Sequence, residues 1–114
     1  MKVYCVYILL CSDNTYYTGV TSDLMGRLES HQMGKYKGSY TYSRRPVKLV
    51  YHCEFTDPEM AITFEKRIKK WSKQKKKALI DGEYDELPNL SKKKFGLLVL
   101  DTFSLHFVSG KHSN

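Results

Sequence analysis

Residues that can move a proton or hold an anion gather near the start of the chain, in the stretch VYILLCSDNTYYTGVTSDLMGRLESH between Val6 and His31. Tyr7 lies in an apolar segment, Tyr17 lies two residues before a glycine, and Arg27 comes one helical turn before the histidine. Histidine titrates near neutral pH, tyrosine does so when its surroundings lower its pKa, and arginine binds oxyanions through a planar fork. Each residue also has an ordinary structural use, as a core tyrosine, a strand-surface tyrosine or a solvent-facing helix residue. The elements that position these side chains therefore decide between chemistry and packing.

The charge of the chain points to a polyanionic partner. Its 114 residues carry 19 Lys and Arg against 12 Asp and Glu, a net charge of +7, with a pI of about 9.3. This length fits one domain, and this charge favours nucleic acid over an anionic membrane. Three cysteines without a CxxC pair argue against a disulfide framework or structural zinc. No segment is long enough to span a membrane and no cleavage site follows the apolar start, so we expect a soluble cytoplasmic protein.

A β-hairpin is predicted at the start of the chain. Residues 3–11 are apolar on both parities, which is typical of a central strand covered on both faces, although a buried helix has the same pattern. Residues 16–21 are rich in aromatic and β-branched side chains, and the residues between the two segments are typical of a turn.

The length of this turn decides whether the two tyrosines share a face. A three-residue loop over 13–15 pairs Cys11 with Tyr17 and places Tyr7, Tyr17 and Gly19 on one face, whereas a two-residue loop separates the tyrosines. In the first register, Gly19 would leave room for a substrate backbone beside Tyr7.

The next segments predict a helix, a basic loop and a third strand. Asp23 or a neighbour caps a helix that runs to about Met33 and ends at Gly34. Arg27 and His31 lie beside the leucine stripe of this helix. Residues 34–46 are a polar, glycine-containing loop, and residues 47–55 form the third strand.

A second helical region begins at Asp57 as N-cap, with Pro58 in its first turn. Glu65 falls at the edge of its apolar stripe, and the helix is expected to break near Ser72 and to end at Asp81-Gly82. The stripe consists of Met60, Phe64, Ile68 and Trp71. We therefore expect a domain over 1–82 and an extension over 83–114, in which alternating Phe103, Leu105 and Phe107 suggest a packed strand or a tail.

The ordered set of motifs resembles the GIY-YIG nuclease domain, in its small, stand-alone, single-domain bacterial form. The first signature matches VYI at residues 6–8, the second matches YTG at residues 17–19, and the family's glutamate matches Glu65 in FEKRIKKW. The family's arginine and histidine match Arg27 and His31. The first signature lacks its glycine, and Thr18 replaces the usual isoleucine.

This resemblance implies an α/β (α+β) fold, with a small three-stranded antiparallel sheet flanked by helices, and hydrolysis of phosphodiester bonds with one Mg²⁺ or Mn²⁺. Glu65 would hold the metal with several waters, and Arg27 would hold the scissile phosphate. The base would be Tyr7, Tyr17 or His31. Taken singly, Glu65 is equally an ordinary helix-surface partner of Lys69.

The nucleic-acid contacts are expected from basic residues of the loop and of the second helical region. They are Lys35, Lys37, Arg44, Arg45, Lys69, Lys73, Lys75 and Lys76. The expected activity has low sequence specificity, favours DNA over RNA, and serves DNA repair or processing, with selection for the structure of the nucleic acid. The alternatives are a non-catalytic nucleic-acid-binding module on the same fold and a basic interaction protein, and no obligate protein partner is inferred.

Overall fold

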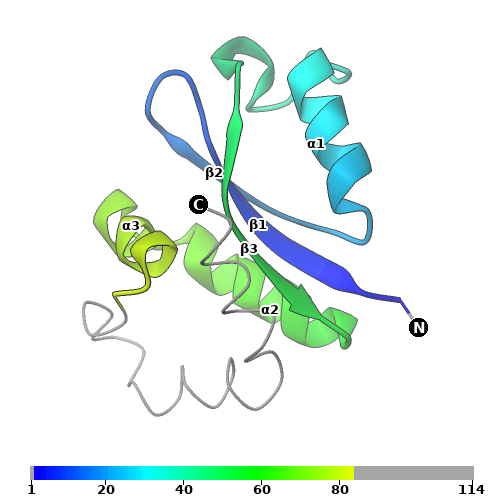
Figure 1. The fold of residues 1–114 in the computed structure, drawn as a ribbon, viewed down its shortest axis with the longest axis vertical. Helices are drawn as coiled ribbons and strands as arrows, with labels where there is room; N and C mark the ends of the chain where they lie inside the picture. Colours follow the sequence, from blue (N-terminus) through cyan, green and yellow to red (C-terminus); the bar gives the residue numbers. More distant parts are fainter. Residues whose placement is uncertain (1, 84–114) are drawn as a thin grey trace.

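The computed structural model describes residues 2–83, which form an α/β fold around a three-stranded antiparallel sheet of order β2-β1-β3 (Figure 1). The strands are β1 (Tyr4–Leu10), β2 (Tyr16–Thr21) and β3 (Lys48–Phe55). The helices are α1 (Leu24–Met33), α2 (Pro58–Lys69) and α3 (Lys73–Asp81), with a short 3₁₀ turn, η1 (Tyr42–Arg44), before β3. The predicted fold class is confirmed. The expectation for Phe103, Leu105 and Phe107 lies outside the described residues and stays a prediction.

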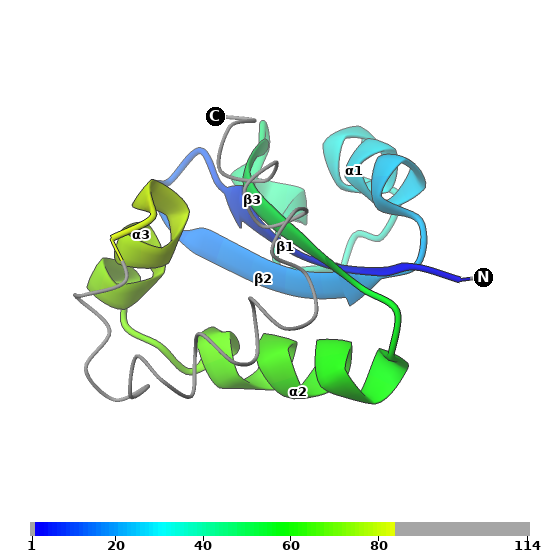
Figure 2. The same ribbon diagram turned by 60° about the horizontal axis from the view of Figure 1, so that its bottom comes forward.

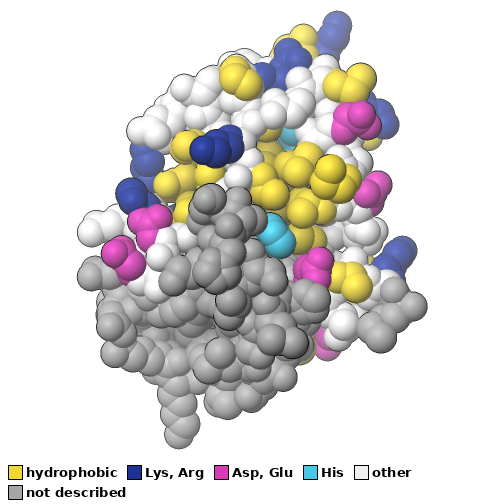
Figure 3. Space-filling model, viewed as in Figure 1, with side chains coloured by type: hydrophobic (Ala, Val, Ile, Leu, Met, Phe, Trp, Pro, Cys, Tyr) yellow, Lys and Arg dark blue, Asp and Glu magenta, His cyan; other side chains and the backbone are white. Residues whose placement is uncertain are grey.

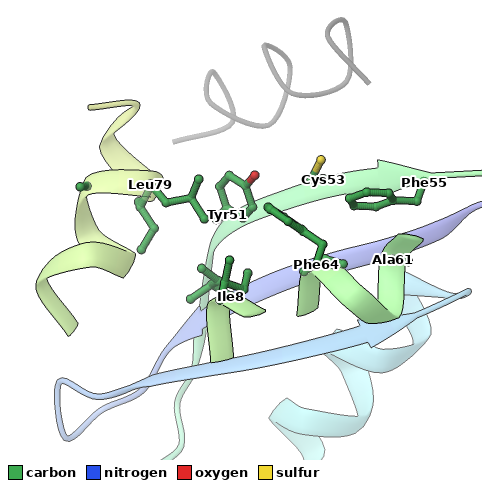
Figure 4. Close-up of a cluster of buried hydrophobic side chains, with 11 residues drawn as sticks. Ile8, Tyr51, Cys53, Phe55, Ala61, Phe64 and Leu79 are labelled. Carbon is green, nitrogen blue, oxygen red and sulfur yellow. The ribbon is translucent and has the colours of Figure 1, made fainter. Parts of the chain in front are cut away.

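The sheet is covered on both faces, as the apolar first segment predicts. In Figure 2, α1 lies above the sheet and α2 below it. Tyr7 of β1 packs in a small cluster with Leu24 and Leu28 of α1. The next residue, Ile8, points to the other face and packs in the larger cluster with Phe64 of α2, which Figure 4 shows. Successive residues of β1 therefore pack into two separate apolar clusters, one on each face of the sheet.

The predicted hairpin register is wrong by two residues, but the predicted face is right. Tyr17 pairs with Leu9 rather than with Cys11. The cause is a longer turn, which is closed by a hydrogen bond of 2.8 Å from the Cys11 N–H to the Thr15 carbonyl. Because side chains alternate with a period of two, an even shift leaves Tyr7 and Tyr17 on the same face.

The helix ends follow the predicted capping residues. Asp23 accepts a hydrogen bond of 3.1 Å from the Gly26 N–H at the start of α1, and Gly34 ends this helix in the left-handed conformation. The break between α2 and α3 occurs at Ser72, whose hydroxyl accepts from the Lys75 N–H at 3.2 Å. Caps of this kind satisfy backbone groups that a helix end leaves unpaired, so they fix where each helix begins.

The three cysteines are free thiols and all are buried, in agreement with the expectation of no disulfide. Burial raises the pKa of Cys5 and of Cys53 to about 12, and it also raises the pKa of Cys11. None of the helices within residues 2–83 has the length and hydropathy needed to cross a bilayer.

Candidate active site

A chain of hydrogen-bonded side chains links β1, α1 and the loop that follows α1. The Tyr7 hydroxyl lies 3.0 Å from Nε2 of His31, and Nδ1 of His31 lies 2.8 Å from the hydroxyl of Thr41. All three residues are buried, with exposed fractions of 0%, 8% and 1%. Two residues of the predicted site, Tyr7 and His31, are therefore in direct contact, and Thr41 extends the contact into the loop.

Arg27 completes this group from the exposed side of α1. The interaction of its guanidinium with the Tyr7 hydroxyl group raises the pKa of Arg27. Burial raises the pKa of Tyr7 to about 12, and Arg27 offsets only part of that effect. Burial, assisted by the charge of Arg27, lowers the pKa of His31 below its ordinary value. Near neutral pH, Tyr7 is consequently protonated and His31 is uncharged.

The ring of Tyr7 occupies the space that Gly19 leaves on the neighbouring strand. The two residues are directly paired, and a Cβ atom at Gly19 would lie 2.5 Å from Oη and 2.6 Å from Cζ of Tyr7. The expectation that Gly19 leaves room for a substrate backbone is therefore corrected: the phenol of Tyr7 fills that room. Glycine at this position is what allows the hydroxyl of Tyr7 to reach His31.

This packing predicts a cost for Gly19→Ala. We expect the added methyl group to displace the Tyr7 ring and to lower the free energy of unfolding by about 1–3 kcal/mol, the usual cost of overpacking a core. Urea denaturation measures the change. Gly38→Ala is the matched control, because nothing lies within 4 Å of a Cβ atom there. An unchanged unfolding midpoint for Gly19→Ala would show that the ring of Tyr7 does not depend on this space.

Tyr17 lies between two other rings at the mouth of the site. Its centroid is 5.1 Å from that of His31, edge to face, and 6.1 Å from that of Tyr40, nearly parallel. The Tyr7 ring lies 6.3 Å away on the same face. Tyr17 is half-buried, so its position joins the buried pair to the surface.

The loop over residues 34–46 is held by its arginines rather than by apolar burial. Arg44 lies over the Tyr40 ring, 3.8 Å from its centroid, and pairs with Asp13 at 2.9 Å. Arg45 lies over the Tyr42 ring at 4.6 Å and donates to the Tyr42 carbonyl at 2.8 Å. Both arginines, which the sequence predicts to contact nucleic acid, thus make contacts within the protein.

The lysines of the loop are placed differently. Lys35 and Arg27 line an open cavity of about 380 Å³ beside the start of α1. Lys35 therefore lies beside Arg27, and Lys37 is open to solvent.

Glu65 belongs to a helix that covers the opposite sheet face. Its helix, α2, packs mainly against β2 and β1, on the side of Ile8 rather than of Tyr7. The Glu65 side chain is only 11% exposed, and the Lys69 ammonium lies 3.5 Å from one carboxylate oxygen. Glu65 is therefore not at the edge of the apolar stripe, as its sequence position suggests, but within the buried face of α2. The described contacts bring together the other four predicted site residues without it.

The remaining predicted basic residues lie near the junction between α2 and α3. Lys73 and Lys76 line an open cavity of about 340 Å³ together with Thr15 and Tyr16. Partial burial and the nearby charge of Lys69 lower the pKa of Lys76. On the face shown in Figure 3, lysine and arginine side chains lie mostly along the outer margin of an apolar centre.

Sequence reasoning missed the contacts that Thr41 and Tyr40 make in this site. Both residues lie in the polar loop over residues 34–46, where the sequence allows loop packing or base stacking for Tyr40 and assigns no role to Thr41. The one available signal is a small hydroxyl residue between two tyrosines, ahead of Arg44 and Arg45, and such a pattern is too common to identify a buried contact.

Comparison with known proteins identifies the family to which this chain belongs. The sequence model of the GIY-YIG catalytic domain matches residues 3–78. A UPF0213 protein of Syntrophus aciditrophicus is 51% identical over 76 residues, covering 66% of this chain and 86% of that protein. A UPF0213 protein of Lacticaseibacillus paracasei is 36% identical over 85 residues, covering 75% and 94%. The solution NMR structure of a UPF0213 protein from Bacillus halodurans is similar with a TM-score of 0.48 and 36% identity, covering 79% of this chain and 95% of that one. Because the catalytic-domain model matches residues 3–78 and a curated relative is 51% identical, this chain belongs to the GIY-YIG family of nucleases, and its relatives include small bacterial UPF0213 proteins.

Proposed function

We propose that this protein is an endonuclease that hydrolyses phosphodiester bonds, in DNA in preference to RNA, with one Mg²⁺ or Mn²⁺ ion. One observation supports this most directly: a buried tyrosine and an uncharged histidine are hydrogen-bonded on the α1 face, and the charge of an exposed arginine acts on both. A phosphodiester resists attack because its negative charge repels a nucleophile, and its hydrolysis needs a fixed cation and a proton acceptor. This group supplies both.

Arg27 is proposed to hold the scissile phosphate. It is exposed at the rim of the cavity of about 380 Å³ that it shares with Lys35. Its planar fork can donate two hydrogen bonds to a phosphate, and it does not lose its charge at any pH at which the protein is folded. Tyr17, half-buried between His31 and Tyr40, would form the wall against which the substrate lies.

His31 is proposed to accept the proton from the attacking water through Tyr7. With a pKa of about 12, Tyr7 holds its proton at neutral pH, so it can take a proton only as its own passes to Nε2 of His31, 3.0 Å away. His31 is ready for that proton because burial lowers its pKa and keeps it uncharged. The two residues then act as one acceptor.

Glu65 is proposed to hold the metal ion. Burying a carboxylate is costly unless a cation compensates it, and the partner here, Lys69, is itself 60% exposed and offers little. Within residues 2–83 no group of three or more His, Cys, Asp or Glu side chains could hold a metal. A single carboxylate completed by water and substrate oxygens suits Mg²⁺, which keeps much of its hydration shell. When bound, the ion would stabilise the charge that develops on the phosphate.

At the β2 edge of the sheet, residues from both faces would contact the same substrate. β2 is an edge strand, with Tyr17 on its α1 face, and α2 packs against it from the other face. A nucleic-acid strand that passes this edge would meet Arg27 on one side and Glu65 on the other.

The second candidate function is a nucleic-acid-binding module without activity. Glu65 lies on a helix of the opposite layer from Tyr7, and the described contacts do not connect Glu65 with Tyr7. This separation favours a protein that binds nucleic acid without cleaving it.

A cleavage panel separates these functions. Labelled single-stranded, duplex, flap and junction DNA, with RNA counterparts, would be incubated with Mg²⁺ or Mn²⁺ and with EDTA. We expect metal-dependent cleavage, and a role in repair or processing predicts a preference for flaps or junctions. Binding without cleavage of any substrate would instead support the binding module.

The lysines of α3 are expected to contribute charge but no base recognition. Replacing Lys73, Lys75 and Lys76 with glutamine should weaken binding to all sequences alike. It should also reduce the slope of log affinity against log salt by up to about 2–3, since each phosphate contact contributes about 0.7–0.9. Lys77 is left intact because it pairs with Asp81 at 2.6 Å.

The matched control removes the same charge elsewhere. It replaces the exposed residues Lys2, Lys48 and Lys66 with glutamine. If both triple variants bind with the same salt slope, α3 is only a solvated basic surface and the substrate docks on another part of the protein.

A further inference from the structure

We propose that Thr41 is a positioning residue that holds His31 in the tautomer with its proton on Nδ1, which leaves Nε2 free to accept from Tyr7. The tautomer itself follows from the contacts of the protein alone. Its effect on cleavage rests on the proposed function.

Both ring nitrogens of His31 are engaged in fixed directions. Nδ1 lies 2.8 Å from the Thr41 hydroxyl and Nε2 lies 3.0 Å from the Tyr7 hydroxyl. The rings of Tyr7 and Tyr17 stand edge-on to the imidazole, at centroid distances of 6.0 and 5.1 Å. The ring plane is thus set by packing, and the proton position is set by the two hydroxyl groups.

Arg27 selects the direction of the hydrogen bonds. The charge of Arg27 acts on the Tyr7 oxygen, and a cation near that oxygen turns the hydroxyl proton away from itself, so the proton is free to point at Nε2 of His31, 3.0 Å away. An uncharged imidazole carries one proton, which must then be on Nδ1. The Thr41 hydroxyl, 2.8 Å away, is the group that accepts it. Tyr7, His31 and Thr41 in this order then form one chain of hydrogen bonds, in which each group donates to the next.

The loop contacts explain why Thr41 can serve as a fixed acceptor. Its carbonyl accepts a hydrogen bond of 3.0 Å from the Arg44 N–H, and the Ser39 hydroxyl lies 3.4 Å from its own. The neighbours on both sides are tyrosines covered by Arg44 and Arg45. The two arginines thereby hold the loop closed over the histidine and bring a loop hydroxyl into a buried position.

The test compares Thr41→Val, which removes the hydroxyl at nearly constant shape, with Thr41→Ser, which keeps it. Long-range ¹⁵N–¹H NMR at pH 8 reports directly which nitrogen of His31 carries the proton. We expect Nδ1–H in the parent protein and in Thr41→Ser, and a shift toward Nε2–H in Thr41→Val. Thr18→Val is the matched control, since it removes another buried threonine hydroxyl, one without a hydrogen-bond partner, and should leave the tautomer unchanged.

Two outcomes overturn the proposal: Nε2–H in the parent protein, or an unchanged tautomer in Thr41→Val. If Thr41→Val does not fold, Thr41→Ala and the parent spectrum still decide. Cleavage should fall about 10- to 100-fold in Thr41→Val and recover in Thr41→Ser, the size of effect that loss of an orienting partner has at metal-bound histidines. If the parent cleaves no substrate, the proposed function fails, while the NMR result still decides the tautomer.

Discussion

The Glu65→Gln variant is expected to cleave nucleic acid at least about 100-fold more slowly than the parent protein in Mg²⁺ or Mn²⁺. Glutamine keeps the size of the side chain and removes the charge that would hold the ion. Because the carboxylate is only 11% exposed and its lysine partner offers little, removing the charge should not lower the melting temperature. Single-turnover cleavage and thermal unfolding, measured on the same preparations, check both expectations.

A second readout for Glu65 does not depend on activity. A ligand that binds only the folded protein raises its stability, so Mn²⁺ should raise the melting temperature of the parent protein and not that of Glu65→Gln. Glu59→Gln, in the exposed first turn of the same helix, is the matched control and should behave like the parent. If nucleic-acid binding and stability collapse together in Glu65→Gln, the residue is structural and the metal assignment is wrong.

The Arg27→Ala variant is expected to slow the cleavage step by about 100- to 1,000-fold, the range seen when one group that stabilises a developing charge is removed. Arg27 would act on one phosphate, so the salt slope of binding should change by no more than about 0.9. Since the side chain is exposed, the unfolding midpoint should change little. Single-turnover rates and a salt series of affinities separate these effects.

Two further variants make the Arg27 test specific. Arg27→Lys keeps the charge but loses the planar fork, and it should recover only part of the rate. Arg67→Ala removes an arginine from α2, on the other layer, and should leave the rate unchanged. Equal loss in Arg27→Ala and Arg67→Ala would mean that total charge, and not a contact with one phosphate, sets the rate.

The elements of this fold could be predicted from the sequence because local residues determine them. Asp23, Gly34 and Ser72 end or begin helices by hydrogen bonds and dihedral angles that involve only near neighbours. The hairpin register is less local. Asn14 adopts a positive φ of 67° within the turn, which then closes between Cys11 and Thr15, and the pattern of turn residues does not specify that length.

The site could be predicted in part, for the same reason. Periodicity places Tyr7 on one face of its strand and His31 beside the leucine stripe of its helix, and the family resemblance predicts that both belong to one site. The contact between His31 and Thr41 depends on a loop that is held by Arg44 and Asp13, which are 31 residues apart, and no short-range pattern encodes it. The sequence places Glu65 only at the edge of the apolar stripe, because the stripe is defined by Met60, Phe64, Ile68 and Trp71, whereas the buried face of α2 also includes Ala61.

The buried thiols have a consequence for reactivity. With a pKa of about 12, Cys5 and Cys53 have a thiolate fraction of roughly 10⁻⁵ at pH 7, and the thiolate is the form that reacts with alkylating agents and oxidants. Cys53 is fully buried and Cys5 is only 6% exposed, so opening of the central sheet is what gives a reagent full access to these sulfur atoms. The rate at which Cys5 and Cys53 are labelled under native conditions therefore measures how often this sheet opens, and a variant that speeds their labelling has a less stable sheet rather than more reactive thiols.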